Sequence, residues 1–332
     1  QPTIQAGIDV AVNDDIVLVD DGVYKGKGNV DVDFKGKAIT VRSVNGSSAT
    51  IIDCQNLYKS GFLFRNGEIQ SSVLRGFTIT KSKGKSGGGI YCDNASPTIS
   101  KCVIIDNQTD NGGGIYCINN SSPSFVDCVV TNNLVSRNGG AIYASNNSTL
   151  SVTRCIISDN RASNGGGVYC INNSSLIIVN CVVVDNRVSE NGGGIYCGAS
   201  APAIINCTIS NNWAGKGSGI YCHLFSAPVL TNTIIWGENP QVIYFSESGT
   251  SNEITVSYSN LQDGQTGIFT NGNGVINWGD GNIDVDPIFL DASAGDYHLR
   301  ENNPCVGIGT PKNTPKTDID GNFRPNPIGS NP

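Results

Sequence analysis

The sequence predicts an all-β fold, a solenoid of stacked parallel coils, and three observations lead to this prediction. A motif that reads NGGGIYC at residues 111–117 occurs six times in related forms, at steps of 25 to 27 residues measured at its tyrosine. Glycine is frequent, with 41 residues, methionine is absent, and aromatic residues make up only 7% of the chain. Short β-prone runs alternate with turn residues throughout. A fixed period of this length indicates a solenoid in which each repeat forms one coil.

Composition and charge argue against two classes of protein. The net charge is −7 and the isoelectric point is near 4.8, whereas proteins that bind nucleic acid carry basic clusters. No run of about 18 apolar residues occurs, so we expect no membrane-spanning helix. The chain starts at Gln1 with a polar segment, as expected of a secreted protein after processing. We therefore expect a protein outside the cell or at its surface, without a nucleic-acid partner.

Twelve cysteines occur, and ten of them fall into two columns of the repeat. Identical residues in successive coils stack roughly 4.8 Å apart and form a ladder. Because a free cysteine behaves as a small buried hydrophobic residue, we interpret the columns as cysteine ladders of free thiols. Disulfides between successive coils are the alternative, and zinc is not expected because no histidine shares either column. The first column is Cys92, Cys117, Cys170, Cys197 and Cys222, and the second is Cys102, Cys128, Cys155, Cys181 and Cys207.

Residues 1–50 are predicted to form an N-terminal cap and the first coils. Residues 4–11 have apolar side chains at helical spacing, which suits a short amphipathic helix over the first coil. Residues 16–19 and 38–41 are apolar, β-prone runs bounded by turn signals, and we expect both to be buried strands. A cap is needed because the open end of a solenoid would expose unpaired strand edges.

These opening residues resemble a known group of proteins. The run from Ile4 through DDIVLVDDGVY at residues 14–24, followed by GKAITVRS at residues 36–43, looks like the first coils of secreted right-handed parallel β-helix proteins. That superfamily contains pectate-lyase-like enzymes and also non-enzymatic adhesins. The resemblance implies a right-handed parallel β-helix (solenoid) of about ten coils with an N-terminal cap, and it leaves the activity open.

Residues 51–236 are predicted to form regular coils of about 26 residues. The positions three before and two after the second cysteine column are always apolar and should point inward. The position directly before that cysteine is polar and should face water, which implies a bend of the chain between two faces. The apolar positions are Ile99, Phe125, Val152, Ile178 and Ile204, with Ile104, Val130, Ile157, Val183 and Ile209, and the polar positions are Lys101, Asp127, Arg154, Asn180 and Asn206.

An asparagine stands five residues after each cysteine of the second column. Asparagine at a coil corner tolerates unusual backbone angles and passes side-chain hydrogen bonds to the next coil, so we predict an asparagine ladder. Its members are Asn107, Asn133, Asn160, Asn186 and Asn212.

The tyrosine of the repeated motif is predicted to point outward. Ile115 and Cys117 face the core, which leaves Tyr116 between them on the outer face. The glycines before them supply a turn or bulge with positive φ. An exposed aromatic column follows, which either only stacks on the sheet or forms a contact face for a sugar or a protein. Its members are Tyr91, Tyr116, Tyr143, Tyr169, Tyr196 and Tyr221.

The repeats also resemble those of chlamydial-type polymorphic membrane proteins, which are surface-exposed β-helix adhesins. Gly139-Gly140-Ala141-Ile142 matches their GGAI form. Residues 104–107 occupy the place of their FxxN motif, with isoleucine instead of phenylalanine. The resemblance implies the same fold and an adhesive role.

After Trp236 the glycine motif and the cysteine columns stop, so residues 237–279 are predicted to be irregular final coils with strands near 241–245 and 253–258. Residues 280–332 resemble the C-terminal module that closes many secreted bacterial β-helix proteins, often just before a surface-anchoring signal. The resemblance rests on GNIDVDPIF at 281–289, GDYHL at 295–299, NPC at 303–305 and TDIDGNFR at 317–324, while residues 306–309 depart from the family pattern. It implies a closing module and a bacterial source.

Candidate catalytic groups are few. Asp159 and Asp185 are each followed two residues later by an arginine, Arg161 or Arg187, and we interpret these pairs as salt bridges at coil corners. Motifs resembling those of polygalacturonases and pectate lyases do not occur, and the chain has only two histidines. No catalytic residue is therefore assigned.

One segment has a pattern that suits a metal. Asp280, Asn282, Asp284 and Asp286 place oxygen ligands at alternate positions, partly as in an EF-hand loop, although the required glycine and final glutamate are missing. This segment is the candidate Ca²⁺ site, with ordinary Asx turns as the alternative. No other cofactor is expected.

The near-uniform columns favour a structural or adhesive protein that is secreted or displayed at the cell surface and self-associates, because an active site should disturb the columns locally. Two other functions stay open. One is a polysaccharide lyase or glycoside hydrolase acting in an outer groove, and the other is a non-catalytic carbohydrate-binding module. The expected partners are further copies of the chain or a glycan.

Overall fold

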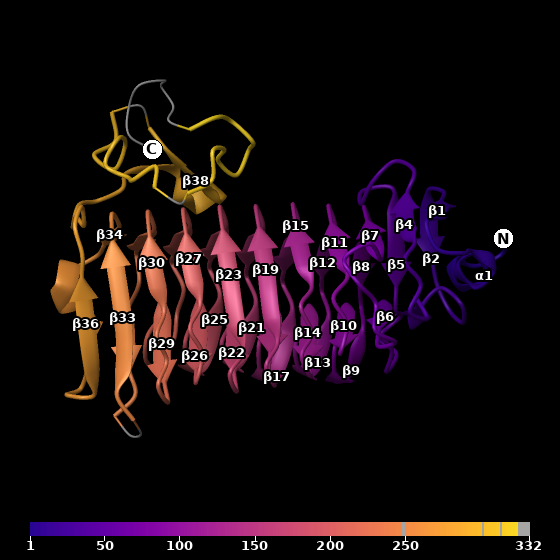
Figure 1. Cartoon of the computed structure of the whole chain (residues 1–332), viewed down its shortest axis with the longest axis horizontal. Coiled ribbons are helices and arrows are strands. Elements are labelled where there is room, and N and C mark those ends of the chain that lie inside the picture. The colour runs from indigo at the N-terminus through magenta and orange to yellow at the C-terminus, as the bar shows by residue number, and fades with distance from the viewer. Residues whose placement is uncertain (248–249, 301, 313, 325–332) are drawn as a thin grey trace.

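The computed structural model describes residues 1–247, 250–300, 302–312 and 314–324. The chain winds into an elongated parallel β-solenoid of about ten coils, with α1 at one end and the C-terminal residues folded over the side of the other (Figure 1). Within these described residues, four parallel sheets run along the rod. Sheet I has 11 strands, sheets II and III have 10 each, and sheet IV has 5. A regular coil passes through sheets IV, II, I and III in turn.

The sheets are built from short strands. Sheet I comprises β1 (Ile16–Val19), β4 (Thr40–Ser43), β7 (Val73–Arg75), β11 (Thr98–Ser100), β15 (Ser124–Val126), β19 (Thr149–Thr153), β23 (Ser175–Val179), β27 (Ala203–Ile205), β30 (Val229–Thr231), β33 (Asn252–Ser257) and β36 (Gly274–Trp278). Sheet II comprises β3 (Val32–Asp33), β6 (Phe62–Phe64), β10 (Ile90–Asp93), β14 (Ile115–Ile118), β18 (Ile142–Ala144), β22 (Val168–Ile171), β26 (Ile195–Gly198), β29 (Ile220–His223), β32 (Ile243–Phe245) and β35 (Ile268–Phe269).

The other two sheets complete the coil. Sheet III comprises β2 (Gly22–Tyr24), β5 (Thr50–Asp53), β8 (Thr78–Thr80), β12 (Val103–Ile105), β16 (Val129–Thr131), β20 (Ile156–Ser158), β24 (Val182–Val184), β28 (Thr208–Ser210), β31 (Ile234–Trp236) and β34 (Asn260–Leu261). Sheet IV comprises β9 (Lys83–Ser86), β13 (Gln108–Asn111), β17 (Leu134–Asn138), β21 (Arg161–Asn164) and β25 (Arg187–Asn191). Short 3-10 helices, η1 (Gly264–Gly267) and η2 (Ala292–Ala294), lie in the C-terminal part.

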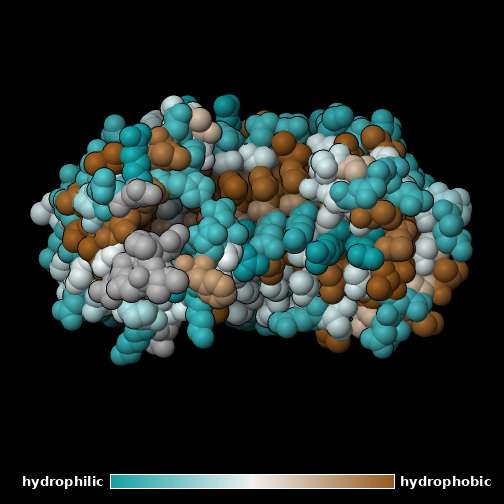
Figure 2. All heavy atoms as spheres, turned by 90° about the horizontal axis from the view of Figure 1, so that it is seen from above, coloured by the Kyte–Doolittle hydropathy of each residue, from teal (hydrophilic) through white to brown (hydrophobic). Residues whose placement is uncertain are grey.

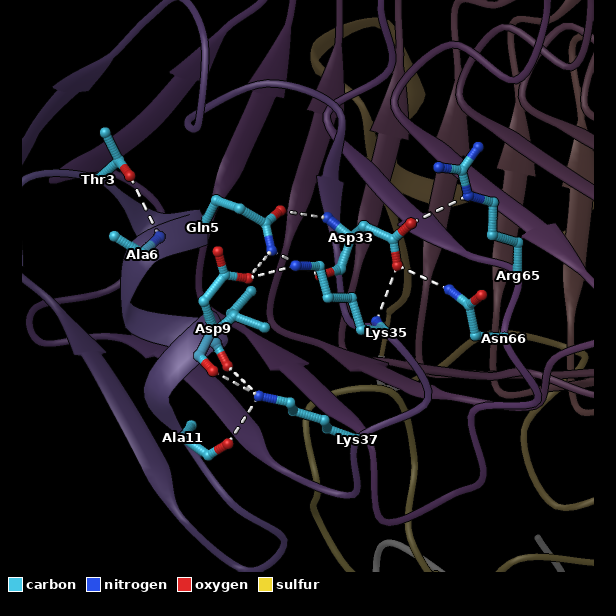
Figure 3. A network of polar contacts seen from close by, with 11 residues as sticks. Thr3, Gln5, Ala6, Asp9, Ala11, Asp33, Lys35, Lys37, Arg65 and Asn66 are labelled. Carbon is cyan, nitrogen blue, oxygen red and sulfur yellow. Dashed lines mark hydrogen bonds and ion pairs between the residues drawn. The ribbon is translucent and has the colours of Figure 1, made fainter.

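The helix predicted at residues 4–11 is present as α1 (Ile4–Val10) and covers the first coil (Figure 3). Thr3 is its N-cap, and the Thr3 hydroxyl accepts a hydrogen bond from the Ala6 amide. Lys37 donates from Nζ to three backbone carbonyls between Ile8 and Ala11, at 2.7 to 2.9 Å. This lysine satisfies carbonyls that the end of a helix leaves free, so the cap is tied to the coil beneath it.

The strands predicted at residues 16–19 and 38–41 correspond to β1 and β4, but only one side of each is buried. Ile16 and Leu18 are 58% and 55% exposed, whereas Val19 and Val41 are buried. The expectation of fully buried strands is wrong because side chains alternate between the two faces of a strand. At this end of the rod the outer face of sheet I is open to solvent.

The core is formed by the predicted columns. Both sets of apolar residues around the second cysteine column are buried. In sheet II the register stacks Cys92 on Cys117, and Cys170 on Cys197 and Cys222. Ala144 takes the cysteine position in the coil between Cys117 and Cys170. All twelve cysteines are free, and all but Cys305 are buried. This arrangement agrees with ladders of thiols rather than disulfides.

We expect the buried thiols, which are all but that of Cys305, to be unreactive until the protein unfolds. Burial raises the pKa of Cys54 and Cys170 to about 12 and that of the less buried Cys305 to about 11, so these three thiols carry little thiolate at neutral pH. Titration with a thiol reagent should label Cys305 first in the native protein, and all twelve cysteines in denaturant without reductant. Recovery of fewer thiols in denaturant would show that the columns contain disulfides.

The asparagine ladder is present at the turn between sheets III and IV, and its five side chains are buried. In the first four asparagines Nδ2 donates to the Oδ1 of the next asparagine at 2.9 to 3.0 Å. Each of these Oδ1 atoms also accepts the preceding asparagine's backbone N–H, at 3.1 Å. The unusual backbone angle belongs to the residue before each ladder position, where φ is +53° to +58°. These left-handed corner residues are Asp106, Asn132, Asp159, Asp185 and Asn211.

The glycines of the repeated motif have two different roles. The first of them, such as Gly112 with φ +61°, is left-handed, as predicted. The second and third let neighbouring coils approach closely. A Cβ atom on Gly140 would lie 2.3 Å from the Gly166 carbonyl oxygen, and one on Gly167 would lie 2.6 Å from that of Gly194. The predicted positive φ therefore applies to the first glycine only.

Residues 237–279 continue the sheets in register. β32 pairs with β29 and aligns Tyr244 with Tyr221, and β33 pairs with β30 and aligns Val256 with Leu230. The final coils are thus more regular than predicted, at least over the described residues. Across the described part of the chain no helix is both long and apolar enough to cross a membrane.

The described part of the predicted closing module turns back along the side of the rod (Figure 1). Its strands β37 (Phe289–Asp291) and β38 (Asp296–Leu299) pair antiparallel. Asn180 donates from Nδ2 to the Thr317 carbonyl at 2.8 Å, and Asn232 exchanges hydrogen bonds of 2.8 and 2.9 Å with the backbone of Thr310. Asn180 and Asn206 are only 3% and 8% exposed. The prediction that this column faces water is wrong where the module covers it, and residues 325–332 lie outside the described residues.

Figure 2 views the rod from the side that carries the module. A strip of hydrophobic residues lies between rows of hydrophilic ones near the middle of this face. The outward side chains of sheet III include Ile156, which is 40% exposed, and the half-buried Val129. Polar residues line the corners on both sides of this sheet.

Candidate functional site

Sheet IV carries an exposed line of unlike side chains, named here the outer column. Four of its strand residues, from Gln108 to Arg187, directly follow ladder asparagines in sequence, and the strand register stacks them on Lys83 of the preceding coil. Isolated bridges add one residue at each end. The outer column comprises Tyr58, Lys83, Gln108, Leu134, Arg161, Arg187 and Trp213, and all seven are exposed.

Both ends of the outer column are aromatic. Tyr58 is 76% exposed and pairs with Lys83, and Trp213 is 52% exposed and pairs with Arg187. With strands about 4.8 Å apart, the two rings lie on the order of 29 Å apart along the rod. Exposed aromatic rings offer apolar faces and, in tyrosine and tryptophan, a polar group beside them.

Two hollows lie on this sheet. The first, named the strand groove, has a volume of about 380 Å³ and lies over β9, β13 and β17. The second, named the corner groove, has a volume of about 320 Å³ and lies where sheet III meets sheet IV. The strand groove is lined by Tyr58, Lys83, Gly84, Lys85, Gln108, Thr109, Asp110, Leu134, Val135 and Ser136. The corner groove is lined by Thr131, Asn132, Asp159, Arg161, Asp185 and Arg187.

The predicted salt bridges at the coil corners are not formed. Over the residues that the structure describes, neither Arg161 nor Arg187 makes an ion pair, and both are exposed. Asp159 and Asp185 lie in left-handed turns and the arginines begin the next strands, and all four side chains line the corner groove without an ion pair among the described residues. The corner groove thus presents carboxylates and guanidinium groups that remain available to a ligand.

Asp185 differs from Asp159 in its environment. Asp185 is half-buried, and burial raises its pKa, with a further rise from the nearby charge of Asp159. A hydrogen bond from the Tyr297 hydroxyl, 3.1 Å from Asp185 Oδ2, acts in the opposite direction. The corner groove therefore contains two carboxyl groups in successive coils, one exposed and one half-buried beneath the module.

The tyrosine column lies on the outer face of sheet II, as predicted, but it is less exposed than expected. Neighbouring rings stack with centroids 4.6 to 5.7 Å apart, and the stack continues to Tyr244 and Phe269. Tyr221 is only 9% exposed, and the earlier members are half-buried. Because each ring covers the face of the next, the column offers edges and hydroxyl groups rather than open ring faces. This geometry favours the stacking role over the sugar-binding role.

Three of the four residues of the candidate Ca²⁺ segment, Asn282, Asp284 and Asp286, bond to different backbone groups. Asn282 Oδ1 accepts the Ser259 amide, and its Nδ2 donates to the Val256 carbonyl. Asp284 and Asp286 accept the backbone amides of Asp263 and Ile288. Across the described residues no cluster of three or more histidine, cysteine, aspartate or glutamate side chains could hold a metal. The arrangement matches the Asx-turn alternative, and Ca²⁺ binding stays a prediction.

The sequence contained a signal for the outer column that the prediction did not use. The residue after each ladder asparagine changes from Gln to Leu, Arg, Arg and Trp, whereas the ladder itself does not change. Lys83 and Lys85 belong to strand β9 of this sheet. What could not be seen was that Tyr58, from an earlier and less regular coil, extends the same column.

Comparison with known proteins identifies the family. The family model described as the right-handed beta helix region matches residues 29–201, which is more than half of the chain. The chain belongs to the right-handed β-helix family. The predicted right-handed parallel β-helix is therefore confirmed. A second model, the Chlamydia polymorphic membrane protein repeat, matches residues 206–223, in agreement with the resemblance of the GGAI motifs.

Two solved structures are similar to this member of the right-handed β-helix family. Pectate lyase Pel9A is similar with a TM-score of 0.50 and 12% sequence identity, covering 95% of this chain and 88% of that one. The catalytic unit of a GH87 alpha-1,3-glucanase from Streptomyces thermodiastaticus is similar with a TM-score of 0.40 and 12% identity, covering 86% of this chain and 67% of that one. No curated protein matches the sequence significantly. At this identity the likeness shows the fold and leaves the function to be argued from the site.

Proposed function

We propose that this protein is a non-catalytic, adhesive β-helix that binds a glycan along the outer column. The observation that carries the proposal is the outer column itself. The tyrosine, asparagine and core columns of the rod are nearly uniform, whereas the outer column changes residue type from coil to coil. Its side chains are exposed, and they line both hollows. A local departure from a regular repeat marks the place where function overrides structure.

The chemistry of the site suits a chain of sugars. Arg161 and Arg187 can donate hydrogen bonds and Asp159 can accept them. Among the residues that the structure describes, no ion pair occupies these groups. A repeating glycan presents hydroxyl groups at a regular spacing, as the coils present donors and acceptors. Trp213 and Tyr58 supply flat apolar surfaces at the two ends, on which sugar rings can stack.

The proposed location is outside the cell or at its surface, and the proposed source is bacterial. The match to a repeat of polymorphic membrane proteins supports a surface location. Self-association of the rod, the other partner expected from the sequence, stays a prediction. Glycan binding and self-association are compatible, since the outer column occupies one side of the rod only.

Glycan binding should be lost when the outer column is altered. We expect the purified protein to bind at least one member of an immobilised panel of xylan, α-glucan, alginate and polygalacturonate. The double variant R161A/R187A and the variant W213A should each bind at least about tenfold more weakly, the equivalent of about 1.4 kcal/mol. Affinity is measured by calorimetric titration with soluble oligosaccharides of the polysaccharide that gives the strongest signal.

Matched controls lie on other faces. Phe225 is an exposed aromatic residue, 67% exposed, in the turn between sheets II and I, and Arg154 lies at the corner between sheets I and III. F225A and R154A should bind as the unaltered protein does. Equal losses in the controls, or binding to no glycan in the panel, would contradict the proposal.

A second candidate function rests on the two carboxylates of the corner groove. Asp159 and Asp185 lie in successive coils, about 4.8 Å apart in strand spacing, and retaining glycosidases use two carboxyl groups about 5 Å apart. The raised pKa of Asp185 suits a general acid. If the protein were a hydrolase or lyase, incubation with the bound glycan would release shorter products, and D159N and D185N would each stop that release. The adhesive proposal expects no products.

A further inference from the structure

A tyrosine from the C-terminal module reaches the corner groove from far along the chain. Tyr297 lies on β38 and is 7% exposed, and its ring packs edge-on against Phe289 with centroids 5.1 Å apart. Its hydroxyl donates to Asp185 Oδ2 at 3.1 Å and accepts from Asn211 Nδ2 at 3.0 Å. One hydroxyl group thus bridges two successive coils at the corner between sheets III and IV.

The position of Tyr297 coincides with the end of the corner groove. Asp159 is exposed and makes no side-chain hydrogen bond within the described residues, whereas Asp185 is half-buried beneath the tyrosine. The lining of the corner groove includes both aspartates but stops short of Asn211, the next residue of the same corner. Without the ring, the same run of polar corner residues would continue by a further coil.

The part of the C-terminal module that carries Tyr297 is held in place by hydrogen bonds from the coils beneath it. Asn180 and Asn232 lie in one column of the rod, two coils apart, and bond to the backbone of Thr317 and Thr310. These contacts fix the module on either side of Tyr297. In the uncovered coils the same column carries charged residues, which could not be buried without partners.

We propose that Tyr297 is a specificity-determining residue that ends the glycan-binding groove. This inference rests on the proposed function. Trp213 lies in the same coil as Asn211, so the exposed indole and the buried tyrosine together bound the last sugar position. A glycan that extends from the outer column past Asp185 gains no further contact along the corner. The affinity therefore reaches a limit at a defined chain length.

The test uses the full chain and a size-fractionated ladder of oligosaccharides from the panel polysaccharide that the unaltered protein binds most strongly. The ladder is titrated into the unaltered protein, Y297A and Y297F. The affinity of the unaltered protein should stop rising at one oligosaccharide length. In Y297A the affinity should continue to rise for longer oligosaccharides, to about tenfold above the highest affinity of the unaltered protein. Y297F keeps the ring, so its affinity should stop rising at the same oligosaccharide length as that of the unaltered protein. This variant shows whether the ring blocks the groove or whether the hydroxyl group is what matters.

The outcomes distinguish glycan binding itself from the role of Tyr297 in ending the groove. If the unaltered protein binds the ladder and Y297A reaches its limit at the same length, Tyr297 does not end the groove, and glycan binding itself still stands. If the unaltered protein binds no member of the polysaccharide panel, glycan binding is rejected and the role of Tyr297 with it. Circular dichroism of Y297A should retain the β-sheet signal, since the tyrosine belongs to the module and not to a coil.

Discussion

Replacing Asn160 by alanine should destabilise the protein by about 3 kcal/mol or more, because it breaks the asparagine ladder at its centre. The Asn160 side chain is fully buried. Its Oδ1 accepts two hydrogen bonds from Asn133, and its Nδ2 donates to Asn186 and to the carbonyls of Val130 and Ser158. The variant leaves several buried polar groups without partners, at about 1 to 3 kcal/mol each.

The change is measured as the shift in the urea midpoint of unfolding. Asn146 provides a matched control, since it is also a stacked asparagine but is exposed and has φ +58°. N146G removes the same amide and keeps a residue that tolerates this backbone angle, so it should change stability by less than about 1 kcal/mol. Similar losses in N160A and N146G would mean that burial of the ladder is not what makes it important.

Replacing Glu238 by glutamine should remove a large part of the pH dependence of stability. The Glu238 carboxyl is buried at the end of the ladder, where Oε1 accepts two hydrogen bonds from Asn212. Burial raises its pKa from the ordinary 4.5 to about 8. Between these pH values the folded protein holds a proton that the unfolded chain has released, so stability falls as the pH rises.

The fall should amount to roughly 3 to 5 kcal/mol between about pH 4.5 and pH 8, at about 1.36 kcal/mol for each unit of the pKa shift. Below and above this window the contribution of Glu238 is constant. E238Q has no such proton and should be more stable than the unaltered protein at pH 8, with little difference at pH 4.5. Urea unfolding across this range tests the difference between the two proteins, and parallel profiles would contradict the buried, protonated state of Glu238.

The coil was predictable from the sequence because each of its columns repeats one kind of residue. Cysteine, isoleucine and asparagine at fixed spacing determine which side chains point inward and which turn joins the strands. Exposure was harder to predict, because it depends on which segments far apart in the chain come together. Asn180 and Asn206 are buried by residues more than a hundred positions later, through contacts such as that with Thr317.

The candidate site was only partly predictable for a related reason. Asp159 and Arg161 could be located at a corner from sequence spacing, but the left-handed φ of Asp159 and the absence of an ion pair between the two among the described residues could not be predicted. Trp213 follows the last ladder asparagine, but Tyr58 lies in an earlier and less regular coil at the other end of sheet IV, so no periodicity connects the two. Tyr297 comes from a segment with no repeat at all.

The most direct test of glycan binding along the outer column is hydroxyl-radical footprinting of the protein with and without the oligosaccharide that it binds most tightly. Side chains covered by the glycan are oxidised more slowly. We predict protection of Trp213 and Tyr58, with Phe225 and the stacked column from Tyr91 to Tyr221 unchanged. Protection confined to the stacked tyrosines, or no change at Trp213 and Tyr58 in the presence of saturating oligosaccharide, would contradict the account.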